Sequence, residues 1–199
     1  MNKFKFVIFV IILSFVFFKI LMALPKDQIA SSKTIKIPAP IMKQIKEDYP
    51  KKISRFQASE IFCLAKNIYF EARNQSTFAK KAIVYVTLNR VQHRTFPNTI
   101  CKVVKQGKVY PWKRNVPIKH KCQFSWYCDG KSDIPKERKA WNKSYDLAVN
   151  MYFNKSYDNT RGSTHYHTDY VKPYWRTDKR LEYVTKIGSH LFYRYRTNK

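Results

Sequence analysis

The stretch from Glu60 to Val91, EIFCLAKNIYFEARNQSTFAKKAIVYVTLNRV, predicts two helices joined by a short polar turn. The second helix, which we expect to begin at Ser76, is apolar on nearly every side from Ala82 to Leu88. It should therefore be the buried centre of a helical domain. The first helix has one apolar stripe, whose members recur at steps of three and four residues: Ile61, Leu64, Ala65, Ile68 and Ala72.

The start of the first helix has two possible positions. Ser54 opens a Ser-x-x-Gln pattern typical of a capping box. A later start would make Ser59 the cap and would put Glu60 in the first turn, where a negative charge favours the helix dipole. We interpret Glu60 as a structural residue.

Glu71 lies at the edge of the apolar stripe, beside the junction of the two helices. Partial burial there would disfavour the charged carboxylate and raise its pKa. A general acid that works near neutral pH needs that property. The alternative is an exposed glutamate in the last turn, paired with Arg73 or Lys66. Position alone favours neither interpretation.

Five sequence blocks bear on this choice: CLAKNIYFEARNQ, AIVYVTLNRV, FPNTIC, CQFSWYCDG and GSTHYH. In this order they resemble the SleB-type family of cell-wall hydrolases, which includes the spore cortex-lytic enzymes. The resemblance spans most of residues 61–194. It implies an α+β, lysozyme-like, mainly helical domain with a small β region, which cleaves peptidoglycan glycan strands. It also implies that the glutamate of the Glu-Ala-Arg block, Glu71, is the catalytic acid.

One departure from the family pattern bears on the mechanism. Asn74-Gln75 stands where the family usually has Gly-Glu, so an acid that could act as a second carboxylate is missing. The sequence after Glu71 offers no obvious replacement, and a single-acid scheme fits better than a two-carboxylate scheme. Glu71 would donate its proton and then remove the proton of the sugar's C6 hydroxyl, the lytic transglycosylase outcome. Muramidase-type hydrolysis remains the alternative.

The resemblance also suggests residues that bind substrate. The GSTHYH block would line the glycan groove, and we predict substrate-binding roles for Gln123, Ser125, Trp126, His165, Tyr166 and His167. Both histidines fall on one side of a strand, a spacing found in some metal sites. Because no Glu-x-x-His motif or second clustered pair accompanies them, we expect no zinc and no other cofactor.

The N-terminal region predicts export. Residues 6–24 are apolar apart from two positions, close to the roughly 20 residues needed to cross a bilayer. Two lysines precede them and should stay in the cytoplasm, which sends the rest of the chain outward. A cleaved signal peptide is the alternative, but no good small-x-small site follows, which favours an anchor.

We therefore expect three parts: residues 1–24 as a membrane anchor or signal, 25–53 as a proline-interrupted linker, and 54–199 as the catalytic domain. That domain would be membrane-anchored in the periplasm, or secreted if the leader is cleaved. The chain has four cysteines, Cys63, Cys101, Cys122 and Cys128. An even count after an export segment suggests two disulfides, and the sequence does not choose among the three pairings.

The charge predicts an anionic partner. Against 13 Asp and Glu, the chain has 39 Lys and Arg, for a net charge of +26. Besides peptidoglycan, we expect the basic surface to meet anionic wall polymers or lipid head groups, and we expect no nucleic acid.

The alternative function is a non-enzymatic, membrane-anchored module that binds nucleic acid or wall polymer. A zinc amidase is the third possibility. The first alternative leaves the half-apolar setting of Glu71 unexplained.

The second half of the chain gives weaker signals. We expect a basic irregular loop over Lys108 to Lys121 and a helix beginning at Pro135. Polar and apolar residues alternate from Gln123 to Trp126, which predicts a strand there. The last part, residues 161–196, mixes turns with β-type residues.

Overall fold

The structure is a computed structural model that describes residues 53–154 and 156–196. The chain divides into two units, residues 1–39 and 40–199, and every described residue belongs to the second. The anchor expected at residues 6–24 and nearly all of the expected linker lie outside the described residues. Within the described part of the chain, no helix combines the length and the apolar character needed to cross a membrane.

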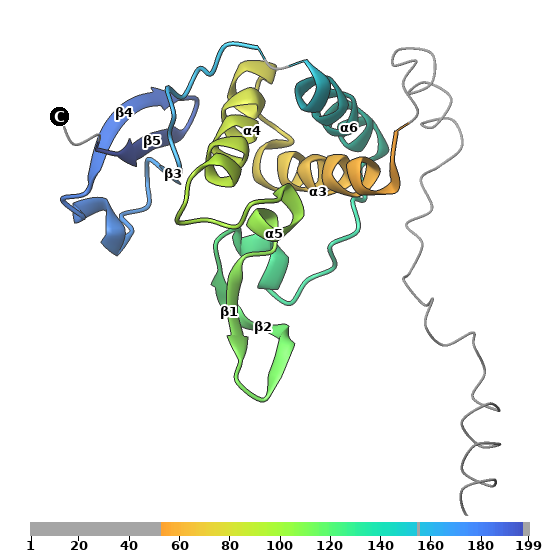
Figure 1. Ribbon diagram of the computed structural model, residues 1–199. Coiled ribbons are helices and arrows are strands. Elements are labelled where there is room, and N and C mark those ends of the chain that lie inside the picture. The colour runs from red at the N-terminus through yellow and green to blue at the C-terminus, as the bar shows by residue number, and fades with distance from the viewer. Residues whose placement is uncertain (1–52, 155, 197–199) are drawn as a thin grey trace, which may run out of the picture. The chain divides into compact units, whose positions relative to one another are not determined.

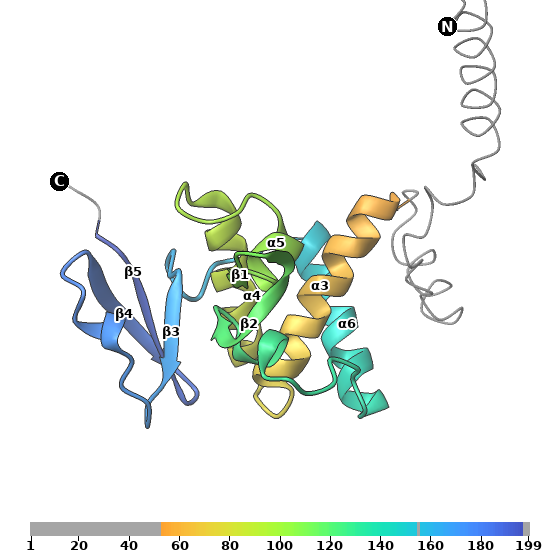
Figure 2. The same ribbon diagram turned by 90° about the horizontal axis from the view of Figure 1, so that it is seen from below.

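Four α-helices build the larger part of the described domain, and Figures 1 and 2 show how they are arranged. They are α3 (Arg55–Ala72), α4 (Thr77–Gln92), α5 (Ile100–Val104) and α6 (Arg138–Phe153). Helix α3 packs against each of the other three. The main core lies between them and consists of buried side chains such as Ile61, Leu64, Ile68, Val84, Val104, Phe124, Tyr145 and Met151.

Side-chain caps set the starts of α3, α4 and α5. Ser54 and Gln57 form a reciprocal capping box on α3, with N···O distances of 3.2 and 3.0 Å. Ser76 caps α4 by accepting a hydrogen bond from the Ala79 N–H, and Thr99 caps α5 in the same way. Every residue from Ala82 to Leu88 is buried, so the predicted central position of α4 is confirmed.

Glu60 is structural, but its role differs from the one expected. Because α3 begins at Arg55, Glu60 lies beyond the first turn. Its buried carboxylate accepts hydrogen bonds from the Ile100 N–H at 2.6 Å and the Cys101 N–H at 3.2 Å. It therefore satisfies the free backbone donors at the start of α5 and joins that helix to α3.

A three-stranded antiparallel sheet follows the helices, in the order β3–β5–β4. Its strands are β3 (His165–Thr168), β4 (Leu181–Ile187) and β5 (His190–Tyr195), and the short 3-10 helix η3 (Tyr174–Thr177) lies between β3 and β4. A second core cluster joins this sheet to α4 through Ile187, Phe192, Ala79, Ile83 and Val86. This packing sets the position of β3 relative to the helices.

The prediction of an irregular basic loop over Lys108 to Lys121 is wrong. This segment belongs to an antiparallel hairpin of two strands, β1 (Gly107–Tyr110) and β2 (Lys113–Cys122). The many lysines made the β-type residues of this segment hard to recognise from the sequence. Pro111 and Trp112 form the tight turn between the two strands. The expected strand at Gln123 to Trp126 is also wrong: Ser125–Cys128 is a 3-10 helix, η2.

The two disulfides are Cys63–Cys101, which joins α3 to α5, and Cys122–Cys128, which joins the end of β2 to η2. Two bonds were predicted, and the structure adds the pairing. The second bond explains η2. The Cα atoms of Cys122 and Cys128 are 6.1 Å apart, whereas six extended residues would separate them by roughly 20 Å.

The predicted fold class, α+β and mainly helical, is confirmed. Helix α6 begins at Arg138 rather than at Pro135.

Candidate active site

The last turn of α3 and strand β3 meet at Glu71. The Tyr166 hydroxyl, from β3, donates a 2.8 Å hydrogen bond to Glu71 Oε2. The Tyr166 ring also lies against Phe192 of β5, with ring centres 5.7 Å apart. Because Phe192 belongs to the cluster that packs the sheet on α4, that packing brings the tyrosine to the glutamate.

The surroundings of Glu71 change its acidity. The residue keeps some exposed surface, but burial around its carboxyl group raises its pKa above the ordinary value. The hydrogen bond from Tyr166 and the nearby charge of Arg90 oppose this rise without cancelling it. Burial and the neighbouring Glu71 hold the pKa of Tyr166 well above its usual range, so its hydroxyl keeps the proton that it donates.

The structure does not pair Glu71 with Arg73 or Lys66, as the alternative interpretation of an exposed glutamate would require. Arg73 pairs with Glu137, with Nε and Oε1 2.9 Å apart. Lys66 lies 3.9 Å from a carboxylate oxygen of Asp133. Both cations that could have paired with Glu71 on the surface therefore have other acidic partners.

Arg90 lies at the end of α4 and is only 4% exposed. Its Nε donates to the Thr164 carbonyl oxygen at 2.7 Å, and Asn89 donates to the Ser163 carbonyl oxygen at 3.0 Å. Both bonds hold the loop that precedes β3. The sequence analysis missed that the charge of Arg90 acts on Glu71 and Tyr166. The signal was available, since Arg90 follows directly on the apolar run from Ala82 to Leu88 and Asn89.

Two of the predicted substrate-binding side chains have their polar atoms bonded inside the protein. Trp126 is buried, donates from Nε1 to Asn67 Oδ1 at 3.0 Å, and stacks on Phe70 with ring centres 4.7 Å apart. His167 is buried, with Nε2 3.1 Å from the Tyr193 hydroxyl. Of the remaining candidates, Gln123 is exposed just before η2, and Ser125 is exposed at the first position of η2.

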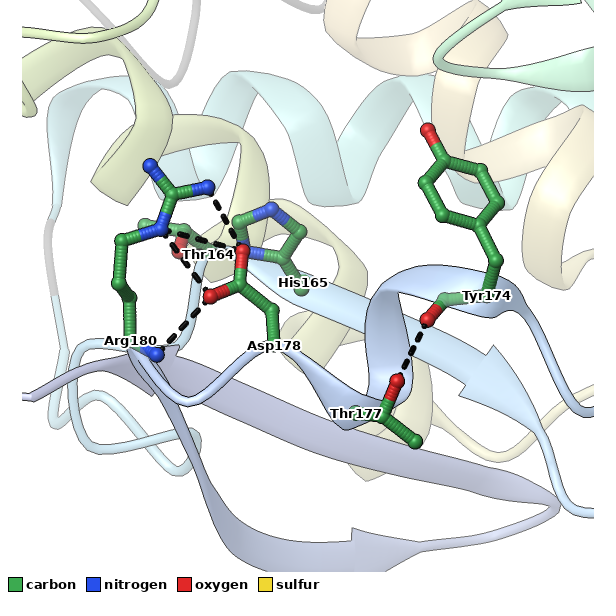
Figure 3. A network of polar contacts seen from close by, with 6 residues as sticks. All are labelled: Thr164, His165, Tyr174, Thr177, Asp178 and Arg180. Carbon is green, nitrogen blue, oxygen red and sulfur yellow. Dashed lines mark hydrogen bonds and ion pairs between the residues drawn. The ribbon is translucent and has the colours of Figure 1, made fainter.

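His165 lies on the opposite side of β3 from Tyr166, where it and His167 both contact the Trp175 ring. Its Nδ1 is 2.9 Å from Thr164 Oγ1, and the Asp178–Arg180 pair lies beside it (Figure 3). Burial first, and Arg90 second, lower the pKa of His165 to about 4. The imidazole is therefore neutral at pH 7. The structure brings Tyr166, and not His165, into contact with Glu71.

The other acidic side chains with described contacts are held elsewhere. Besides Glu60, these are Asp129 on the Lys131 N–H, Asp133 with Lys66, Glu137 with Arg73, Asp158 on the Thr160 and Gly162 N–H groups, Asp169 with Lys186, Asp178 with Arg180, and Glu182 with Arg194. Among the described residues, no group of three or more His, Cys, Asp and Glu could hold a metal ion.

A family model for cell wall hydrolases matches residues 74–193 of this sequence. The chain belongs to the cell wall hydrolase family. The family predicted from the five sequence blocks is thereby confirmed. Glu71 lies just before the matched segment, so its role is not part of that finding.

The solved structures to which this chain is similar include two catalytic domains. The catalytic domain of the Bacillus cereus SleB protein is 24% identical, with a TM-score of 0.48, over 69% of this chain and 91% of that chain. The catalytic domain of the germination-specific lytic transglycosylase SleB from Bacillus anthracis is 24% identical, with a TM-score of 0.47, over 67% and 92%. No curated protein matches the chain.

Proposed function

We propose that this cell wall hydrolase cleaves the glycan strands of peptidoglycan, with Glu71 as the general acid and then the general base. The observation that carries the proposal is the Glu71 carboxyl group, whose pKa burial raises and which Tyr166 holds by a hydrogen bond. A general acid must still hold its proton near the working pH, and a raised pKa meets that need.

In the first step, Glu71 donates its proton to the oxygen that links N-acetylmuramic acid to N-acetylglucosamine. The bond between that oxygen and C1 of the muramic residue breaks, and the leaving sugar departs with the proton. Glu71 is then a carboxylate. Tyr166 and Arg90 both favour the charged form, so they would stabilise it at this stage.

In the second step, the Glu71 carboxylate removes the proton of the C6 hydroxyl of the same muramic residue. The O6 atom bonds to C1, which gives a 1,6-anhydro sugar and returns Glu71 to its protonated form. No water is consumed. A two-carboxylate hydrolysis would need a second acid about 5–9.5 Å away. Glu71 bonds to the Tyr166 hydroxyl, the charge that acts on its pKa is that of Arg90, and the other acidic side chains with described contacts are held by other partners. These observations favour the single-acid route.

Further parts of the proposal rest on the sequence. Gln123, Ser125 and His165 would bind the substrate's N-acetyl groups, and the domain would have the lysozyme-like form that the family resemblance implies. Residues 1–24 would anchor the chain, with residues 25–53 as a linker and the catalytic domain outside the cytoplasm. The two disulfides support an oxidising compartment.

The products test the reaction type. Purified peptidoglycan is digested with the full chain, and the fragments are reduced with borohydride and analysed by mass spectrometry. The proposal predicts muramic ends that resist reduction and that are lighter by one water than unreduced hydrolysis products. Reducible muramic ends would instead show hydrolysis, and cleavage in the stem peptides would show that the glycan is not the target.

A further inference from the structure

The β1–β2 hairpin, residues 107–122, extends away from the helices in Figure 1. Its base is firmly held. The disulfide Cys122–Cys128 ties the end of β2 to η2, and the backbone of Gly107 lies close against Cys122. A Cβ atom at Gly107 would lie 2.7 Å from Cys122 Sγ, so only glycine fits this approach. The hairpin is thus a projection on a fixed base.

The tip of the hairpin, residues 109–113, exposes apolar surface. The chain turns at Pro111 and Trp112, between the paired residues Tyr110 and Lys113. Trp112 is 80% exposed and Val109 is 43% exposed. The rings of Tyr110 and Trp112 lie together, with centres 5.2 Å apart. Trp and Tyr side chains of this kind are enriched where proteins meet partners or the membrane interface.

The same hairpin is strongly cationic. Between residues 107 and 122 the sequence has five Lys and Arg and no acid, and no Asp or Glu occurs anywhere between Glu71 and Asp129. Lys108, Lys113 and Lys121 are all exposed. The charge favours an anionic partner, and the aromatic tip favours one that also accepts apolar surface.

We propose that the β1–β2 hairpin docks on an anionic lipid bilayer. Trp112 and Tyr110 would enter the head-group region, which suits amphipathic rings, and the lysines would meet lipid phosphates. Shape decides between lipid and polymer. A strand of glycan or nucleic acid is held in a groove, whereas a projecting tip with exposed cations beside its aromatic residues and behind them fits a flat surface. The inference does not depend on the glycan chemistry proposed above.

Trp112 provides the probe. The full chain is reconstituted in nanodiscs that carry acyl-brominated phosphatidylcholine, with or without phosphatidylglycerol, and the quenching of tryptophan fluorescence is measured. The other three tryptophans are buried or half-buried, so they give the background. We expect clear quenching in the anionic discs that Trp112→Phe removes, and little quenching in the zwitterionic discs. Equal quenching in both discs, or quenching that survives Trp112→Phe, would overturn the proposal.

A charge-matched pair of variants tests the role of the lysines. One variant changes Lys108, Lys113 and Lys121 to Gln. The other removes the same charge from exposed residues around η3 by changing Lys172, Arg176 and Lys179 to Gln. The hairpin variant should lower the docking constant by roughly 100-fold, because each cation near an anionic surface contributes several-fold. The control should change it little. If both variants lower the docking constant equally, the hairpin is not a specific docking surface. If spin-labelled wall polymer quenches Trp112 and lipid does not, the bilayer is not its partner.

Discussion

The hydrogen bond from the Tyr166 hydroxyl to Glu71 Oε2 joins residues that are 95 positions apart in the sequence. It links the first strand of the three-stranded sheet to the last turn of α3. Burial favours the neutral carboxyl group, while the hydrogen bond and Arg90 favour the carboxylate. A group that must give and then take a proton benefits from both influences.

Replacing Tyr166 by Phe should change the pH dependence of the reaction. Loss of the hydrogen bond raises the pKa of Glu71 further, because that bond lowers it. Since protonated Glu71 begins the reaction, the high-pH limb of the kcat profile should move to higher pH. The value of kcat should fall by roughly 10- to 100-fold, the range for a hydrogen bond to a charged group. Tyr157→Phe, at an exposed position, is the control. An unmoved high-pH limb would contradict this role for Tyr166.

Glu71→Gln should alter how stability depends on pH. The folded-state pKa of Glu71 lies above its unfolded value. As pH rises, the unfolded chain loses this proton first, so wild type loses stability between the two pKa values and then levels off. The Gln variant has no such loss, and its stability relative to wild type should rise across that window. Urea unfolding at several pH values measures it, and parallel profiles for the two proteins would refute the shift.

The helix starts could be predicted because they depend on neighbours in sequence. Ser54, Ser76 and Thr99 each accept a hydrogen bond from a backbone N–H three residues later, and such patterns are visible in the sequence. The contact of Tyr166 with Glu71 depends on how a sheet packs against α4, which no local pattern reports. The family resemblance named both residues for the site, but their contact came from the structure.

Two predictions from the sequence were wrong, the strand at Gln123 to Trp126 and the loop at Lys108 to Lys121, and both errors have a physical cause. Gln123 to Trp126 does alternate between exposed and buried residues, yet the Cys122–Cys128 bond requires a tight turn there. The β1–β2 hairpin was hidden by its charge. Its lysines are solvated and leave the strand pairing unaffected, so a basic composition was a poor guide to backbone structure.

The two disulfides should stabilise the fold unequally. Cys63–Cys101 closes the longer loop, with a sequence separation of 38 against 6 for Cys122–Cys128. Replacing both members of the first pair by Ala should lower the free energy of unfolding by roughly 4 kcal/mol, and the second pair by roughly 2 kcal/mol. Urea denaturation measures both losses. Peptide mapping without reduction should recover these two pairs, and four free thiols in exported protein would contradict the assignment.

The central claim concerns the proton on Glu71, and wall lysis by Glu71→Gln tests it most directly. Gln keeps the shape of the side chain and loses only the titrating proton. Glu137→Gln is the matched control, because Glu137 is exposed and pairs with Arg73. Both variants are compared with wild type by zymography and by the clearing of purified walls, after circular dichroism has shown a native fold. We expect Glu71→Gln to lose at least about 100-fold in lytic rate, the usual contribution of a general acid, and Glu137→Gln to remain active. A folded Glu71→Gln protein that clears walls at the wild-type rate would contradict the mechanism.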